Sequence, residues 1–318
     1  MTSPYKKILV TGGSAVAGGA LKDVAESEYP EREFIFPSSH DFDLTALQDT
    51  IRMIDTYRPN AIIHFAARSG GIGISGAKPA TLLRDNVLMN IHIMEAARIF
   101  GVPKTVMTLS TGMYPANAPI PLKESSLHDG VPHPSVDSYA FAKRLIEPMI
   151  RAYRTEYGLS VIGLTPNAIV GERSNFNPEA STMVPALVRR FYENRNSTKP
   201  ITVWGDGSPL REITYGKDIA RAFMWCLDRY DGTECLNIGT TEEASVKDIA
   251  FMIADAMDID RNRIAFDATK PAGQFRKSTD NSLFTTLSHF RYTPIRETLK
   301  KTINYFFHHY PDQEKLRL

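Results

Sequence analysis

In the first half of the chain, short apolar runs alternate with segments of helical periodicity, and this alternation is the strongest constraint on the fold. The apolar runs are Lys7–Val10, Phe34–Phe36, Ala61–Phe65 and Thr105–Thr108. Amphipathic patterns separate them, as at residues 47–57. Continuous apolar strands, each followed by a helix, indicate a parallel sheet that is covered on both faces. The sequence therefore predicts a doubly wound α/β domain.

Composition argues against nucleic acid or a membrane as partner. The 318 residues include 37 Lys and Arg against 36 Asp and Glu, a formal net charge of +1, which gives no electrostatic reason to bind a polyanion. No apolar stretch approaches the roughly 20 residues of a membrane span, and no signal-peptide pattern is present at the N-terminus. Cys226 and Cys235 are expected to be free thiols. His308 and His309 lack a third ligand, so no metal is expected. We predict a cytoplasmic protein.

A glycine-rich turn at residues 11–18 directly follows the first predicted strand and opens a helix. Glycines let the backbone approach a pyrophosphate, whose charge is stabilised at a helix N-terminus. Such a turn alone is a weak signal, but its position between strand and helix strengthens it. We expect a dinucleotide to contact Gly12, Ser14, Ala15, Val16 and Gly18.

The end of the second predicted strand bears on which dinucleotide binds. An NAD site would place a carboxylate there for the ribose hydroxyls. In this chain, no acidic residue lies between the end of that strand at Phe36 and Asp41. The hydroxyls of Ser38 and Ser39 can accept a 2′-phosphate, so we expect NADPH. Asp43 and Leu44 are predicted against the adenine. Alternatively, Asp43 only caps the following helix, and the sequence leaves both interpretations open.

Ser110, Tyr139 and Lys143 are the candidate catalytic residues. Ser110 closes the strand at 105–108, and a spacing of four places Tyr139 and Lys143 on one face of a predicted helix. A free phenol has a pKa of about 10. A nearby ammonium favours the phenolate, so Tyr139 can exchange a proton with a carbonyl oxygen. Because the Ser110 hydroxyl can hydrogen-bond the same oxygen, the three residues predict a carbonyl reductase.

After Gly171 the character of the chain changes. Residues 172–178 are polar and irregular, and a helical pattern follows from about Pro185 to Asn194. The apolar run Leu236–Ile238 is expected to return to the main sheet. We therefore predict a dinucleotide-binding domain of residues 1–170 plus about 213–240. A smaller ligand-binding α/β domain would comprise residues 171–212 and 241–318.

Together these motifs resemble the extended short-chain dehydrogenase/reductases. More narrowly, the chain resembles the GDP-L-fucose synthases, NADPH-dependent 3,5-epimerase/4-reductases of GDP-4-keto-6-deoxymannose. Further shared motifs are His64-Phe65-Ala66-Ala67, Asn86, and the stretches at 70–72, 184–191, 203–212 and 267–277. The resemblance spans essentially the whole chain. It implies a Rossmann fold, a GDP-sugar-binding C-terminal domain, and a homodimer paired through helices that include residues 139–143.

The resemblance also implies roles for individual residues. At the cofactor it adds Ala66, Ala67 and Pro166, beside Tyr139 and Lys143. For the GDP-sugar it implies Thr111, Gly112, Thr182, Arg190, Trp204, Arg211 and Lys277. Arginine's planar fork suits phosphate oxygens. Alternatives stay open, since Arg190 alone is typical of a solvated helix face and Trp204 of core packing.

The chain departs from the family at several positions. Ala15 replaces the middle glycine of the turn, and Asn167-Ala168 stands where the family has Thr-Asn. Gly112 and Thr182 occupy the positions of a cysteine and a histidine that serve, in the family, as base and acid for epimerisation at C3 and C5. Epimerisation beside a ketone needs one group to remove the C–H proton and another to return one. Glycine and threonine cannot do this at neutral pH.

Reduction needs neither missing group, because the hydride comes from NADPH and the proton from Tyr139. We therefore hypothesise a 4-reductase of a GDP-4-keto-6-deoxy sugar, hexose or heptose, without 3,5-epimerase activity, in GDP-deoxysugar biosynthesis. A bifunctional enzyme remains an alternative, with His128 or His133 as the replacement group. A non-catalytic NADP(H)-binding sensor would not need Ser110 or Lys143. A 4-epimerase holding NAD would want an acid after the second strand.

Overall fold

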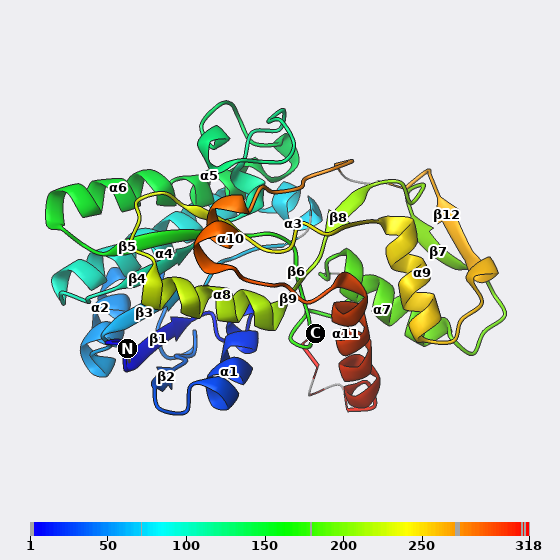
Figure 1. The fold of residues 1–318 in the computed structure, drawn as a ribbon, viewed down its shortest axis with the longest axis horizontal. Coiled ribbons are helices and arrows are strands. Elements are labelled where there is room, and N and C mark those ends of the chain that lie inside the picture. Colours follow the sequence, from blue (N-terminus) through cyan, green and yellow to red (C-terminus); the bar gives the residue numbers. More distant parts are fainter. Residues whose placement is uncertain are drawn as a thin grey trace.

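The computed structural model describes residues 3–70, 72–178, 180–270, 274–312, 314 and 316–317. Of the motifs above, Gly71 and residues 271–273 lie outside this description. Two regions lie side by side in Figure 1. The larger surrounds a parallel sheet, and the smaller carries the strands labelled β7 and β12.

The sheet of the larger region has six parallel strands. They are β1 (Lys7–Thr11), β2 (Glu33–Ile35), β3 (Ala61–His64), β4 (Thr105–Thr108), β5 (Val161–Pro166) and β10 (Leu236–Ile238). Their spatial order is β10-β5-β4-β3-β1-β2. The chain runs outward from β1 to β2 and then resumes on the other side of β1 with β3, which creates a switch point at their carboxyl ends. The prediction of a doubly wound parallel sheet is confirmed.

Helices cover both faces of this sheet. The helices of this region are α1 (Val16–Glu28), α2 (Leu47–Tyr57), α3 (Ile72–Ala77), α4 (Pro79–Ile99), α5 (Asp137–Arg144), α6 (Ile146–Tyr157) and α8 (Gly216–Arg229). Helices α1 and α8 pack with Ile8 and Val10 on one face, whereas α2, α4 and α6 pack with Leu9 on the other. Since side chains alternate along a strand, a sheet covered on both faces needs apolar residues at successive positions.

The smaller region has a separate apolar core. It is built from α7 (Met183–Asn194), β7 (Ile201–Trp204), β8 (Leu210–Glu212), β11 (Glu243–Ser245), α9 (Val246–Ala256), β12 (Ile264–Asp267) and α11 (Ile295–His309). β6 (Ile169–Val170) pairs with β9 (Thr214–Tyr215) between the regions. α10 (Ser282–Ser288) returns to the larger region and places Phe284 in its core. In the described ranges, no helix is both long and apolar enough to cross a membrane.

A buried hydrogen-bond network joins the two regions. Asn167 Nδ2 donates to Glu212 Oε2 at 2.9 Å and to the Thr240 carbonyl at 2.8 Å. Thr214 Oγ1 donates to Asn167 Oδ1, and the Glu212 carboxylate accepts from the backbone N–H and hydroxyl of Thr279, both at 3.0 Å. Burial raises the pKa of Glu212 to about 7. The Asn167 amide is therefore used to hold the two regions together.

Replacing Glu212 with glutamine should remove a pH-dependent contribution to stability. The folded pKa of about 7 lies above the ordinary 4.5, so the stabilisation is present below pH 4.5 and lost as the pH rises through 7. We expect the free energy of unfolding of E212Q, minus that of the wild type, to rise over this window by up to about 3 kcal/mol. Denaturant unfolding at several pH values measures this difference.

The matched control is Glu243→Gln. The ion pair with Arg276 holds the pKa of Glu243 below its ordinary value, so its variant should lose stability relative to the wild type as the pH rises from the acid range. A difference for E212Q that is flat or falling between pH 4.5 and 7.5 would contradict the buried-charge account.

Candidate active site

The glycine-rich turn lies at the switch point between β1 and β3. Gly12 has a φ of +73°, and a Cβ there would stand 2.6 Å from the backbone nitrogen of Ala66. A Cβ at Gly18 would collide with the Gly12 carbonyl oxygen. Glycine is required at Gly12 because the segment after β3 packs against it, and at Gly18 because α1 packs directly against the turn. α1 begins at Val16 with no side-chain cap and no acidic residue in its first turn, so its free N–H groups suit an anion.

The predicted adenosine contacts lie in the loop after β2. Ser38 and Ser39 are exposed, and Ser38 Oγ accepts from the His40 backbone at 3.1 Å. Asp43 Oδ1 accepts from the backbone N–H and hydroxyl of Thr45 at 2.9 and 2.8 Å. Asp43 thus stabilises the turn before α2, whose N-cap is Ala46. The remaining predicted cofactor contacts are spread over four places. Ser14 and Ala15 lie in the glycine-rich turn, Leu44 in the loop after β2, Ala67 after β3 and Pro166 at the end of β5.

The structure brings the three predicted catalytic residues together at the end of β4. Ser110 caps a short 3₁₀ turn (Thr111–Met113), and its Oγ accepts from the Gly112 backbone at 3.2 Å. Tyr139, in α5, hydrogen-bonds to Ser110. Lys143, one helical turn later, is 1% exposed and donates from Nζ to the Thr108 carbonyl at 2.8 Å.

Burial sets the protonation of this group. It raises the pKa of Tyr139 to about 12, and the hydrogen bond with Ser110 offsets only part of the rise. Burial also lowers the pKa of Lys143 to about 7. The expected lowering of the Tyr139 pKa by Lys143 is therefore not seen in this structure, because desolvation is the larger effect on the phenol. The Tyr139 phenol is therefore protonated at neutral pH.

A buried hydrogen-bond chain that the sequence patterns did not predict supports α5. His64 Nδ1 accepts from Thr11 Oγ1 at 2.8 Å, His64 Nε2 donates to Asn90 Oδ1 at 3.2 Å, and Asn90 Nδ2 donates to the Ala142 carbonyl at 3.3 Å. Burial lowers the pKa of His64 to about 3, so its ring is neutral and each nitrogen has one role. The sequence signal that could have revealed this chain is Asn90, which lies one helical turn after Asn86 in α4.

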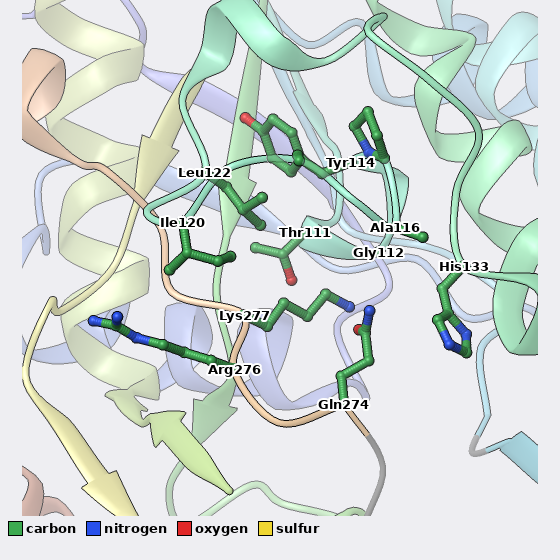
Figure 2. Close-up of a pocket in the computed structure, with 12 residues that line it drawn as sticks. Thr111, Gly112, Tyr114, Ala116, Ile120, Leu122, His133, Gln274, Arg276 and Lys277 are labelled. Carbon is green, nitrogen blue, oxygen red and sulfur yellow. The ribbon is translucent and has the colours of Figure 1, made fainter.

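A pocket opens beside Ser110 (Figure 2). It is lined by the segment 111–122, by His133 and by the segment 274–277. Thr111 and Gly112 form one side of it, and Figure 2 shows the Lys277 side chain reaching into it. His128 instead lies on the surface, where its Nε2 is 3.0 Å from Glu147 Oε2. Of the two histidines considered above, only His133 lines this pocket.

The other predicted substrate residues lie further along the smaller region. Trp204, at the end of β7, is 53% exposed, so the core-packing interpretation is wrong. The Arg190 guanidinium lies 5.9 Å from its ring centroid and donates to the Thr202 carbonyl at 2.7 Å. Arg211 donates to a backbone carbonyl of its own strand, β8. Thr182 is the exposed N-cap residue of α7, and its side chain makes no capping bond.

Comparisons with known proteins agree with this architecture. Residues 8–239 match the NAD dependent epimerase/dehydratase family. The GDP-L-fucose synthase of Dictyostelium discoideum is 32% identical over 318 residues, which cover 99% of each chain. The structure of a GDP-L-fucose synthetase from Naegleria fowleri bound to NADP superposes with a TM-score of 0.91 at 31% identity, covering 100% of this chain and 98% of that one. A GDP-mannoheptose C4 reductase from Campylobacter jejuni, at 22% identity and a TM-score of 0.85 over 96% of this chain and all of that one, shares the fold.

Lys143→Met should separate stability from activity. The pKa of Lys143 is about 7 in the folded chain, against an ordinary 10.5. Burial of its ammonium therefore destabilises the fold by on the order of 5 kcal/mol below pH 7, and this penalty disappears as the pH rises to 10.5. The unpaired Thr108 carbonyl costs the variant about 1–3 kcal/mol. We expect K143M to be more stable than the wild type by about 2 kcal/mol at pH 7, with ketone reduction slowed about 100- to 10,000-fold.

Thermal unfolding at pH 7 and pH 10 provides the measurement, since the advantage of K143M should shrink at the higher pH. Tyr139→Phe is the matched control. It should lose activity without gaining stability, because the Tyr139 phenol is uncharged at pH 7 in both the folded and the unfolded chain. Equal destabilisation of K143M and Y139F at pH 7 would show that burial of Lys143 carries no penalty.

Proposed function

The chain belongs to the NAD dependent epimerase/dehydratase family and is an extended short-chain dehydrogenase/reductase of the GDP-L-fucose synthase type; on that premise we propose that it is an NADPH-dependent 4-reductase of a GDP-4-keto-6-deoxy sugar, hexose or heptose, that lacks 3,5-epimerase activity. The observation that carries the proposal is Gly112 beside an intact Ser110, Tyr139 and Lys143. The chain keeps every group that reduction needs.

The residues around the glycine-rich turn fit a dinucleotide. Gly12 and Gly18 leave a surface that any side chain would fill, and the first turn of α1 presents free N–H groups. Ser38 and Ser39 are exposed hydroxyls where an NAD site would have a carboxylate. The Naegleria fowleri relative was solved with NADP bound. These features support NADPH, which supplies the hydride when bound.

The chain's own groups provide the other half of the reduction. Ser110 would hydrogen-bond the C4 carbonyl oxygen, and Tyr139 would give this oxygen a proton as negative charge develops on it. Burial keeps the Tyr139 proton in place at neutral pH. Lys143 lies on the same face of α5, and its ammonium would offset the negative charge that forms on the phenol and would contact the nicotinamide ribose.

The missing epimerase groups support the narrower part of the proposal. Gly112 has no side chain that could remove a proton from C3 or C5, and the Thr182 hydroxyl is a very weak acid and base at neutral pH. The substrate would then be either unepimerised or already processed by another enzyme. We further propose a cytoplasmic enzyme of GDP-deoxysugar biosynthesis.

One observation favours a second candidate, a bifunctional 3,5-epimerase/4-reductase. His133 and Lys277 both line the pocket beside Gly112, so two side chains that can carry protons lie close to the position of the missing cysteine. A non-catalytic sensor is disfavoured, because it would not need the Ser110–Tyr139 pair. An NAD-holding 4-epimerase is disfavoured by the exposed serines after β2.

Turnover in D₂O separates the two candidates. With GDP-4-keto-6-deoxymannose and NADPH, we expect NADPH oxidation without enzyme-dependent deuterium at C3 or C5, and much slower oxidation of NADH. Mass spectrometry and NMR of the product give the measurement. Deuterium at either carbon would support the bifunctional enzyme instead. If NADPH is not oxidised with this sugar, with its 3,5-epimer or with the corresponding heptose, the reductase proposal is wrong.

We also propose a homodimer paired through α4 and α5. Phe141 and Leu145 are 40% and 41% exposed at a spacing of four, and Leu83 on the neighbouring α4 is 40% exposed. Phe141→Glu should convert a dimer into a monomer in light scattering coupled to size exclusion, because it places a charge within an apolar contact. Leu287→Glu, at another exposed apolar side chain, should leave the dimer intact. A wild-type monomer at micromolar concentration would rule this pairing out.

A further inference from the structure

The Lys277 ammonium is the most unusual charged group of the pocket beside Ser110. Across the described residues it has no hydrogen-bond or ion-pair partner. It is nevertheless only partly exposed to water, and burial, followed by the charge of Arg211, lowers its pKa. An ammonium held in this way is costly unless a ligand supplies an acceptor. The neighbouring Arg276 is different, because its guanidinium pairs with Glu243 at 2.5 Å and points away from the pocket in Figure 2.

The position of this ammonium is tied to Gly112. Lys277 Nζ lies 4.0 Å from the point where a Cβ on residue 112 would stand, and Ser110 Oγ lies 3.4 Å from the same point. The lysine therefore reaches the end of the pocket where the carbonyl would be bound. Any side chain at residue 112 would begin within 4.0 Å of both groups. Glycine leaves this room open.

We propose that Lys277 is a sugar-specificity residue, whose ammonium donates a hydrogen bond to the substrate hydroxyl next to the C4 ketone, in the space that Gly112 leaves free. The inference rests on the proposed function and adds a role to it. A protonated amine is a donor and cannot remove a proton, so this contact would hold the neighbouring carbon without epimerising it. Lys277 would thus act at the sugar and not at the diphosphate.

A sugar contact and a diphosphate contact have different consequences for the binding of GDP alone. If Lys277 contacts the sugar, K277M should bind GDP within about threefold of the wild type, while kcat/KM for the GDP-keto-sugar falls about 10- to 100-fold, the usual effect of losing a charged hydrogen bond. Calorimetry with GDP and initial rates with NADPH measure the two quantities. Lys300→Met is the matched control, because Lys300 is an exposed lysine of α11 that does not line the pocket; it should change neither quantity by more than about twofold.

The link to Gly112 is tested by a double-mutant cycle. Gly112→Ala adds a methyl group at ordinary contact distance from Ser110 Oγ and Lys277 Nζ, so the fold should accept it. We expect G112A to lower kcat/KM in the wild type and to have little further effect in K277M, because the contact that it disturbs is already gone. Additive effects would show that the two positions act separately.

Several results would overturn the inference. GDP binding that weakens tenfold or more in K277M would place Lys277 at the diphosphate. If the wild type incorporates deuterium at C3 or C5 and K277M does not, while reduction stays intact, Lys277 would be an epimerisation base. Unchanged kinetics in K277M would remove it from the site. If the wild type itself fails to bind GDP or to oxidise NADPH, the proposed function has failed and the role of Lys277 falls with it.

Discussion

A parallel sheet buried on both faces is the constraint on which the rest of this molecule depends. Because all six strands run in one direction, their carboxyl ends meet at one edge. The glycine-rich turn after β1, the loop after β3, Ser110 after β4 and Pro166 at the end of β5 are brought to that edge together. Gly12 and Ala66 touch there because β1 and β3 are neighbours.

Burial of Lys143 at this edge lowers the stability of the fold. Lys143 is enclosed and its pKa is lowered to about 7, while Tyr139 is held as a neutral phenol. A fold selected for stability alone would not bury an ammonium whose one hydrogen-bond partner among the described residues is a backbone carbonyl. The neutral His64 and Asn90 show how such a group is supported, since they fix the turn of α5 before Lys143 through uncharged hydrogen bonds.

The pocket beside Ser110 contains open space because residue 112 is a glycine and has no side chain. In a family that places a cysteine there, glycine removes a reactive group and also opens space toward Lys277. The C-terminal segment 274–277 supplies this lysine. The Leu210 backbone N–H in β8 donates to the Phe275 carbonyl and Glu243 in β11 pairs with Arg276, so these two strands hold the segment in place. The shape and charge of this pocket are therefore decided jointly by the segment after β4 and by a segment of the smaller region.

Local patterns in the sequence determined the strands, the helices, the glycine turn and the pairing of Tyr139 with Lys143, because each depends on spacings within one element. The sequence could not decide whether Trp204 is buried, nor which of His128 and His133 faces a pocket. It also gave no prediction of the His64–Asn90 chain. These outcomes depend on packing between elements far apart in the chain. The approach of Lys277 to Gly112 also depends on such packing. Only the docking of the smaller region against the segment after β4 brings an amine to the space that glycine leaves.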